Sequence, residues 1–435
     1  MIRAPRSWLA AALLATSILP ACGGSLRQQN ARAPGDAAAS KHTGSGDDGS
    51  ADARGGTREL NLEPLRIEVV PDADGKLTTT ATDARTLFEE ANDLLMQRQF
   101  DQALAAYERL TADFPGSSLV PAAYYNAGIA WEGKSDYAQA ADRYRRAVAA
   151  AAPGSKDGRD ASFRLGAVLA ESKQFGESVT TFEKLLDTDT LAPEERLEAL
   201  ARLGYALVEL KDYTGAEEVL RQALAFHKEA AAKGQIETNY FASMAQYYLA
   251  VIPHRQFRAV PLRYPEEQMG RDLEHKSELF MLAEERYTRL IEGYPNPYWT
   301  TAAIYQIGLM YKEFWDDFMA VPLPAGMTAA GGKEYVKLLN TNKDLRKLLE
   351  KSLYVHEKNV VHSREVGLQS VWVDASDVRA GEVKQIIARQ EKGELIQPGS
   401  IARPDGSTEE GTEPQGAEAS AGKESNDYIP ARQEL

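Results

Sequence analysis

The chain of 435 residues repeats one sparse pattern four times, at intervals of 37 or 38 residues. Each copy has a small residue (slot 8), a second small residue twelve positions later (slot 20), and a bulky residue four positions after that (slot 24). The slots hold Ala91, Gly128, Gly166 and Gly204, then Ala103, Ala140, Ser178 and Ala216, and finally Tyr107, Tyr144, Phe182 and Leu220. A period of this length is typical of a solenoid of stacked helix pairs, in which small residues let two backbones approach closely.

The clearest copy runs from Tyr124 to Trp131 and continues from Asp136 to Ala140. This pattern of aromatic, small and Trp positions resembles the tetratricopeptide (TPR) family, and Pro115 closes the first copy where that family places a proline. The resemblance implies an all-α, right-handed TPR-like solenoid of about six helix pairs over residues 83–330. Its fifth and sixth units are interrupted, because Ala283 comes 26 residues late after Ala245 and prolines follow the helix that contains Gly308.

The first 22 residues indicate a processing signal. Arg3 and Arg6 precede an apolar run that is too short to span a membrane as a permanent helix. The run ends in Leu19-Pro-Ala-Cys22, which resembles a bacterial lipobox, although Pro20 is unusual there. The resemblance implies that Cys22, the only cysteine, is lipidated and palmitoylated. Because Gly and not Asp follows Cys22, it also implies a periplasm-facing place at the outer membrane. The alternative is an ordinary secretory signal that leaves Cys22 as a free thiol.

The segments on either side of the repeats differ from them in composition, and the outermost ones are predicted to be disordered. Residues 23–82 have few apolar side chains and predict a tether, interrupted by a possible strand at 65–70 that either packs on the first repeat or pairs with a partner. Residues 331–390 predict a C-terminal helical extension that caps the array, with a basic lipid or partner surface as the alternative. Residues 391–435 predict an acidic disordered tail.

The sequence gives no sign of an enzyme. It contains no Gly-rich phosphate loop and no metalloprotease motif, and its six histidines are scattered. We therefore expect no catalytic residues, no cofactor and no metal. A net charge of −14 disfavours nucleic acid as a partner. The oligomeric state is left open.

Partner binding is expected on the concave face and at the fifth-unit insertion. In TPR-like arrays slot 5 faces the groove, and here it holds Phe88, Tyr125 and Phe163, with Tyr205 following in slot 9 of the fourth unit. The alternative is that these rings pack between units. The insertion contributes Arg258, Arg263 and Tyr264, where basic and apolar residues alternate up to Arg271.

Together these features predict a non-catalytic, outer-membrane-anchored scaffold that binds envelope proteins in a multi-protein complex. The long C-terminal extension favours a motility (gliding or pilus) or secretion apparatus. The alternatives are an accessory factor for β-barrel outer-membrane protein assembly, and a recruiter or regulator of cell-wall enzymes.

Overall fold

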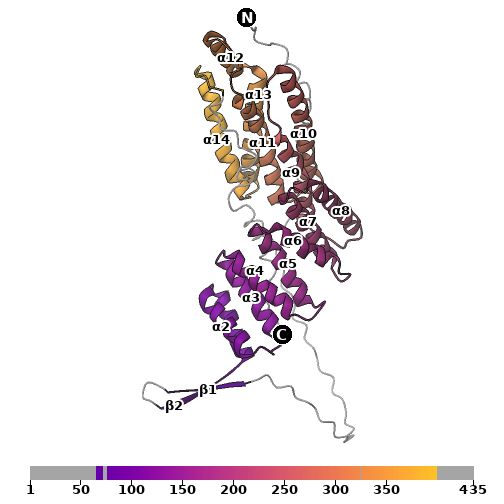
Figure 1. The fold of residues 1–435 in the computed structure, drawn as a ribbon, viewed down its shortest axis with the longest axis vertical. Coiled ribbons are helices and arrows are strands. Elements are labelled where there is room, and N and C mark those ends of the chain that lie inside the picture. Colours follow the sequence, from indigo (N-terminus) through magenta and orange to yellow (C-terminus); the bar gives the residue numbers. More distant parts are fainter. Residues whose placement is uncertain (1–64, 72–75, 325, 399–435) are drawn as a thin grey trace.

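The computed structural model describes residues 65–71, 76–324 and 326–398, and in these residues it contains fourteen α-helices and one β-hairpin. The expectation of an all-α solenoid is confirmed, and Figure 1 shows an elongated stack of helices with the hairpin at one end and α12 at the other. The first four pairs are α1 (Ala84–Met96) with α2 (Phe100–Asp113), α3 (Val120–Gly133) with α4 (Tyr137–Ala150), α5 (Lys156–Glu171) with α6 (Phe175–Leu186), and α7 (Pro193–Glu209) with α8 (Tyr213–Ala232).

Close contact at slot 8 explains the small residues there. A Cβ added to Gly128 or Gly166 would lie 2.6 Å from the ring of Tyr144 or Phe182, the slot-24 residue of the same pair. The turn between the two helices of each pair is also repeated, because one residue there has a φ between 59° and 63°: Arg98, Ser135, Lys173 and Lys211. The sequence period thus reflects one backbone geometry used four times.

The fifth pair consists of α9 (Tyr240–Ala259) and α10 (Glu266–Gly293). The residues inserted between Ala245 and Ala283 mainly lengthen both helices, and only a short segment connects them, as the prolines around Arg263 predict. From Ala242 to His254 every residue of α9 is buried. A helix enclosed in this way lies in the core and not on the wall of an open groove.

The sixth pair is completed after a second insertion. Helix α11 (Pro297–Ala320) packs against α13 (Lys343–Glu365), and α12 (Ala329–Thr341) lies between them in sequence. Ser352 Oγ donates a hydrogen bond to the Gly308 carbonyl at 2.8 Å, as Ser178 Oγ does to the Gly166 carbonyl at 2.8 Å. Ser352 therefore occupies slot 20 and His356 occupies slot 24, so α13 is the delayed second helix of this unit.

A last helix, α14 (Val371–Glu391), packs on both α11 and α13 as the first helix of a further unit would. Its buried Trp372 lies against Tyr305 with ring centroids 5.5 Å apart, and Asn359 Nδ2 donates to Ser376 Oγ at 2.8 Å. The expected capping is thus provided by α14, whereas α13 belongs to the array itself.

The hairpin consists of β1 (Leu65–Pro71) and β2 (Leu77–Asp83), antiparallel with Leu65 opposite Asp83 and Pro71 opposite Leu77. The predicted strand is present, but its partner is the following segment, a Thr-rich stretch that was predicted to belong to the tether. The predicted tail and most of the predicted tether lie outside the described residues.

Candidate functional site

The predicted groove aromatics lie in the interior. Phe88, Tyr125, Phe163 and Tyr205 are each at most 8% exposed. The first three contact the slot-24 ring of their own pair, with centroid separations of 6.2 Å to Tyr107, 5.6 Å to Tyr144 and 6.3 Å to Phe182. The ring centroid of Tyr205 lies 4.7 Å from that of Tyr248 in the next unit. This placement favours the alternative in which the rings pack between helices and units, and it leaves little ring surface for a ligand.

Polar side chains connect successive units beside these rings. Asn92 Oδ1 accepts hydrogen bonds from Tyr107 Oη at 2.6 Å and from Asn126 Nδ2 of the next unit at 2.8 Å. One unit later, Glu132 accepts from Tyr144 of its own pair and from Arg164 Nη1 of the following unit at 3.2 Å. Such bonds fix the rotation of each pair on its neighbour, because a mispacked unit would leave buried polar groups unpaired.

The fifth-unit residues are also engaged within the molecule. Arg263 forms a two-point contact with Asp272, with Nη2 to Oδ1 at 2.9 Å and Nε to Oδ2 at 3.1 Å. Arg258 pairs with Glu313, and Tyr264 Oη lies 3.1 Å from Tyr335 Oη on α12. Arg258 is thus paired inside the molecule, whereas Arg263, whose side chain is 58% exposed, forms its ion pair at the surface beside the partly exposed Tyr264.

The two insertions meet at one end of the array. Tyr264 follows α9 and Tyr335 lies on α12, so their contact joins the fifth-unit insertion to the sixth-unit one. We call this region the extension and define it as residues 254–277 and 313–345. In Figure 1 it lies at the end where α12 and the start of α10 are drawn. The sequence predicted two separate insertions, whereas in the structure the contact between Tyr264 and Tyr335 links them.

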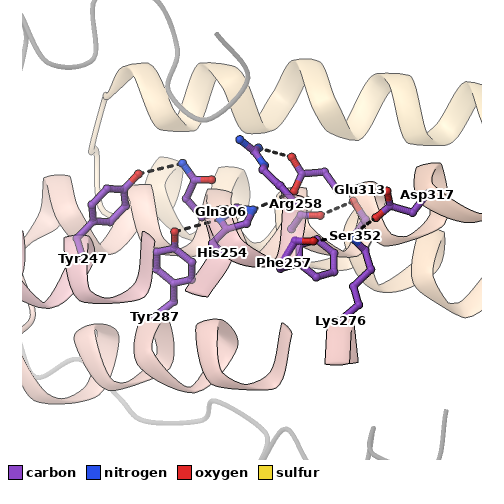
Figure 2. A network of polar contacts seen from close by, with 11 residues as sticks. Tyr247, His254, Phe257, Arg258, Lys276, Tyr287, Gln306, Glu313, Asp317 and Ser352 are labelled. Carbon is purple, nitrogen blue, oxygen red and sulfur yellow. Dashed lines mark hydrogen bonds and ion pairs between the residues drawn. The ribbon is translucent and has the colours of Figure 1, made fainter. Parts of the chain in front are cut away.

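A buried polar network crosses the extension from α9 to α10 and α11 (Figure 2). His254, which is fully buried, lies with Nε2 2.9 Å from Glu313 Oε2 and with Nδ1 3.2 Å from Tyr287 Oη. Arg258 binds the other oxygen of the Glu313 carboxylate. Burial opposes the charged form of Glu313, but the charge of Arg258 and the hydrogen bonds from His254 and Arg258 lower the pKa of Glu313 to about 2. Burial lowers the pKa of His254, so at neutral pH a neutral imidazole bridges Tyr287 and the carboxylate.

Lys276 of α10 forms the second part of the network. Its side chain is fully buried, and its Nζ contacts Asp317 Oδ2 at 2.7 Å, the Phe257 carbonyl at 2.5 Å and the Val260 carbonyl at 3.1 Å. The same ammonium lies 3.9 Å from the centroid of the Phe257 ring. One cation thus ties the end of α9 to both α10 and α11.

This network was not predicted from the sequence. The signal is visible in retrospect, because Glu313, Asp316 and Asp317 interrupt an otherwise apolar helix and need buried partners. The groups neutralise one another: a carboxylate faces each of the cations Arg258 and Lys276. The arrangement holds three long helices in register, and it resembles structural ion-pair networks more than a reaction centre.

Two further observations limit the kinds of site in the described part of the chain. No group of three or more His, Cys, Asp or Glu side chains is placed there to hold a metal ion. No described helix has the length and apolar character needed to cross a membrane. Cys22, the predicted lipidation site, lies outside the described residues.

Comparison with known proteins identifies the repeats. The tetratricopeptide repeat model matches residues 88–156, 133–193 and 163–235. No curated protein matches the chain. Among solved structures, it is similar to PilF of Pseudomonas aeruginosa (15% identity, covering 62% of this chain and 97% of that one, TM-score 0.34). It is also similar to a tetratricopeptide repeat protein of Parabacteroides merdae (14% identity, covering 71% and 98%, TM-score 0.38).

The matched residues 88–235 span α2 to α8 and part of α1, and the fifth and sixth pairs lie beyond them. Arrays of this family are in general non-catalytic scaffolds for protein–protein interaction. Residues 88–235 of this chain therefore match tetratricopeptide repeats, and such repeats imply a protein–protein interaction scaffold.

Proposed function

We propose that this chain is a lipoprotein anchored through Cys22 at the periplasmic face of the outer membrane, where it assembles protein partners of a motility or secretion apparatus. The observation on which the proposal rests is the N-terminal sequence, in which the only cysteine follows a charged segment, an apolar run and a small residue. The helical array supports it, because a repeat scaffold acts by binding other proteins.

The anchor is tested by replacing Cys22 with serine in the full-length chain. The proposal expects loss of lipid labelling, a precursor that keeps its signal segment, and disappearance of the protein from the outer-membrane fraction. Replacement of Ser25, three residues further on, is the matched control and should leave all three readouts unchanged. A Cys22→Ser protein that is still processed and fractionates normally would show that the anchor assignment is wrong.

The process is tested by deletion of the gene. Loss of surface movement or of secretion, with normal levels of β-barrel proteins, is the expected result. Reduced β-barrel protein levels would instead indicate an assembly factor, and cell chaining or lysis would indicate a partner of cell-wall enzymes. Crosslinking in intact cells, followed by identification of the adducts, would name the partners directly.

A further inference from the structure

The hairpin carries an apolar face that no described residue covers. Leu65, Ile67, Val69 and Leu77 are 57–68% exposed. The register places all four on one face, because side chains alternate along a strand and Pro71 lies opposite Leu77. On the order of 400 Å² of aliphatic surface is thus exposed in one patch, a size at which patches are often functional.

The opposite face of the hairpin is fixed to the first helix pair. Arg66 forms an ion pair with Asp113 at the end of α2, and its register partner Thr82 is buried. At the base, β2 continues without a loop into α1, where Asp83 accepts a hydrogen bond from the Thr86 amide at 2.7 Å. The apolar face therefore lies on the side of the hairpin opposite the Arg66–Asp113 ion pair. Figure 1 shows that the hairpin projects from one end of the array.

We propose that this face lies on the lipid surface to which the chain is anchored. The inference rests on the proposed function, since it requires the lipid at Cys22. Only 42 residues separate Cys22 from Leu65. Even fully extended they span at most about 150 Å, so an anchored chain keeps the hairpin within that distance of the bilayer and able to reach it. Weak interfacial binding of a few aliphatic side chains is sufficient when a second attachment already exists.

Other occupants fit the face less well. A second copy packed face to face would bury about half of the roughly 800 Å² per partner that stable interfaces use. A strand added at the open edge of β1 would extend the sheet and leave its apolar face uncovered. A bilayer covers the whole face, and a hairpin lying flat keeps the backbone groups of its edges among headgroups and water, where they find hydrogen-bond partners.

This placement orients the whole array. With the hairpin on the membrane, the first repeat is nearest the lipid and the extension with α12 lies at the far end of the molecule (Figure 1). The hairpin then orients the scaffold on the lipid surface, and the extension is the part of the described array farthest from the bilayer.

The test uses the lipidated full-length protein in vesicles of phosphatidylethanolamine and phosphatidylglycerol. Because the sulfur of Cys22 carries the lipid, a cysteine introduced as Ile67→Cys is the only reactive thiol and accepts a polarity-sensitive fluorophore. The matched control is Val378→Cys on α14, since Val378 is 61% exposed and Ile67 is 60% exposed. The label at position 67 should shift to the blue, lose most of its iodide quenching and become quenched by nitroxide lipids, whereas the label at 378 should not.

The outcomes separate this inference from the proposed function. Mass spectrometry of the N-terminal peptide shows whether Cys22 is acylated in the same sample. If it is acylated and both labels are equally accessible to iodide, the inference is wrong and the anchor stands. If it is not acylated, both fail. Protection of position 67 that rises with protein concentration in detergent would assign the face to a second copy. Protection seen in native membranes but not in lipid vesicles would assign it to a protein partner. Either result overturns the lipid assignment.

Discussion

At the scale of single residues, His356 departs most from the repeat. It occupies slot 24, which Tyr144 and Phe182 fill in earlier pairs, and a Cβ on Gly308 would lie 2.8 Å from its ring. The imidazole is fully buried, and neither ring nitrogen has a hydrogen-bond partner among the described residues. Burial, and then the charge of Arg379, lowers the pKa of His356 from 6.5 to about 4. The neutral form is thus strongly favoured in the folded chain.

Replacement of His356 by phenylalanine should therefore change the pH dependence of stability. The folded pKa lies below the unfolded one, so the unfolded chain binds the proton first and stability is lost as pH falls from 6.5 towards 4. The full difference corresponds to about 3 kcal/mol. Denaturant unfolding at several pH values gives the free energy of unfolding of both proteins, and the contribution of His356 is the wild-type value minus the His356→Phe value. Subtraction cancels the contributions of other titrating groups, which both proteins share. One of these is Asp316: burial raises its pKa to about 6, so its contribution to stability grows as the pH falls, opposite to that of His356. Parallel curves for the two proteins would contradict the prediction.

The slot-8 glycines allow a second test. Gly166→Ala should destabilise the protein by about 1–3 kcal/mol, because the new methyl group meets the Phe182 ring at 2.6 Å and the core must shift. Gly270→Ala on α10 is the matched control, since a Cβ there meets nothing within 4 Å. It should be neutral or stabilise by about 0.5–1 kcal/mol through helix propensity. Urea unfolding measures the free energy of unfolding of both variants. Equal changes at the two positions would show that close packing against Phe182 is not the reason for a glycine at position 166.

Residue patterns predicted the small and bulky slots but not the role of slot 5. The slot-8 and slot-24 residues meet inside one pair, so their chemistry follows directly from the repeat. An aromatic residue on a first helix can point into a groove or between helices, and hydrophobicity is the same in both cases. Phe88, Tyr125 and Phe163 could be placed only by their contacts with Tyr107, Tyr144 and Phe182.

Among the helices, those of the extension and of the sixth pair could be predicted from the sequence only in part. The late position of Ala283 and the start of a sixth unit at Gly308 were visible in the sequence. That α13 completes this unit was not, because Ser352 lies 44 positions after Gly308 instead of twelve and a histidine follows it in slot 24. A long insertion removes the period on which the repeat assignment depends, and only the contacts of Ser352 and His356 restore it.

The ion pair between Lys276 and Asp317 should contribute strongly to the stability of the folded extension. Lys276→Met leaves Asp317, 9% exposed at its side chain, without the nearby cation, and removing one partner of a buried pair typically costs about 3–5 kcal/mol. Thermal unfolding measures this loss. The double variant Lys276→Met with Asp317→Leu should recover a large part of it, because no lone charge is left in the core. A double variant as unstable as the sum of the two single variants would show that the two groups act independently.

For the molecule as a whole, the last helix pair of the array must be capped. Terminal repeats must present a polar outer face, or the apolar surface of the last pair is left in water. In this chain α14 provides that face: Trp372, Val373, Ala380 and Val383 are buried on its inner side, while Asp374, Asp377, Glu382 and Lys384 are exposed. The sequence predicted capping helices over residues 331–390, because a solenoid without a cap exposes its core. In the structure α13 belongs to the sixth pair, and α14 provides the cap.

A chain that stops after Gly367 should therefore aggregate. The truncation removes α14, uncovers Tyr305 and takes away Ser376, a hydrogen-bond partner of Asn359. We expect a species that elutes as large aggregates in size-exclusion chromatography and unfolds at a lower temperature than the full-length chain. A chain that stops after Pro398 is the control, because residues 399–435 are rich in Gly, Ser and Glu and poor in the apolar side chains that a core requires. It should elute and melt like the full-length protein. If the chain lacking α14 also stayed monodisperse with an unchanged melting temperature, the helix would have some other role than closing the solenoid.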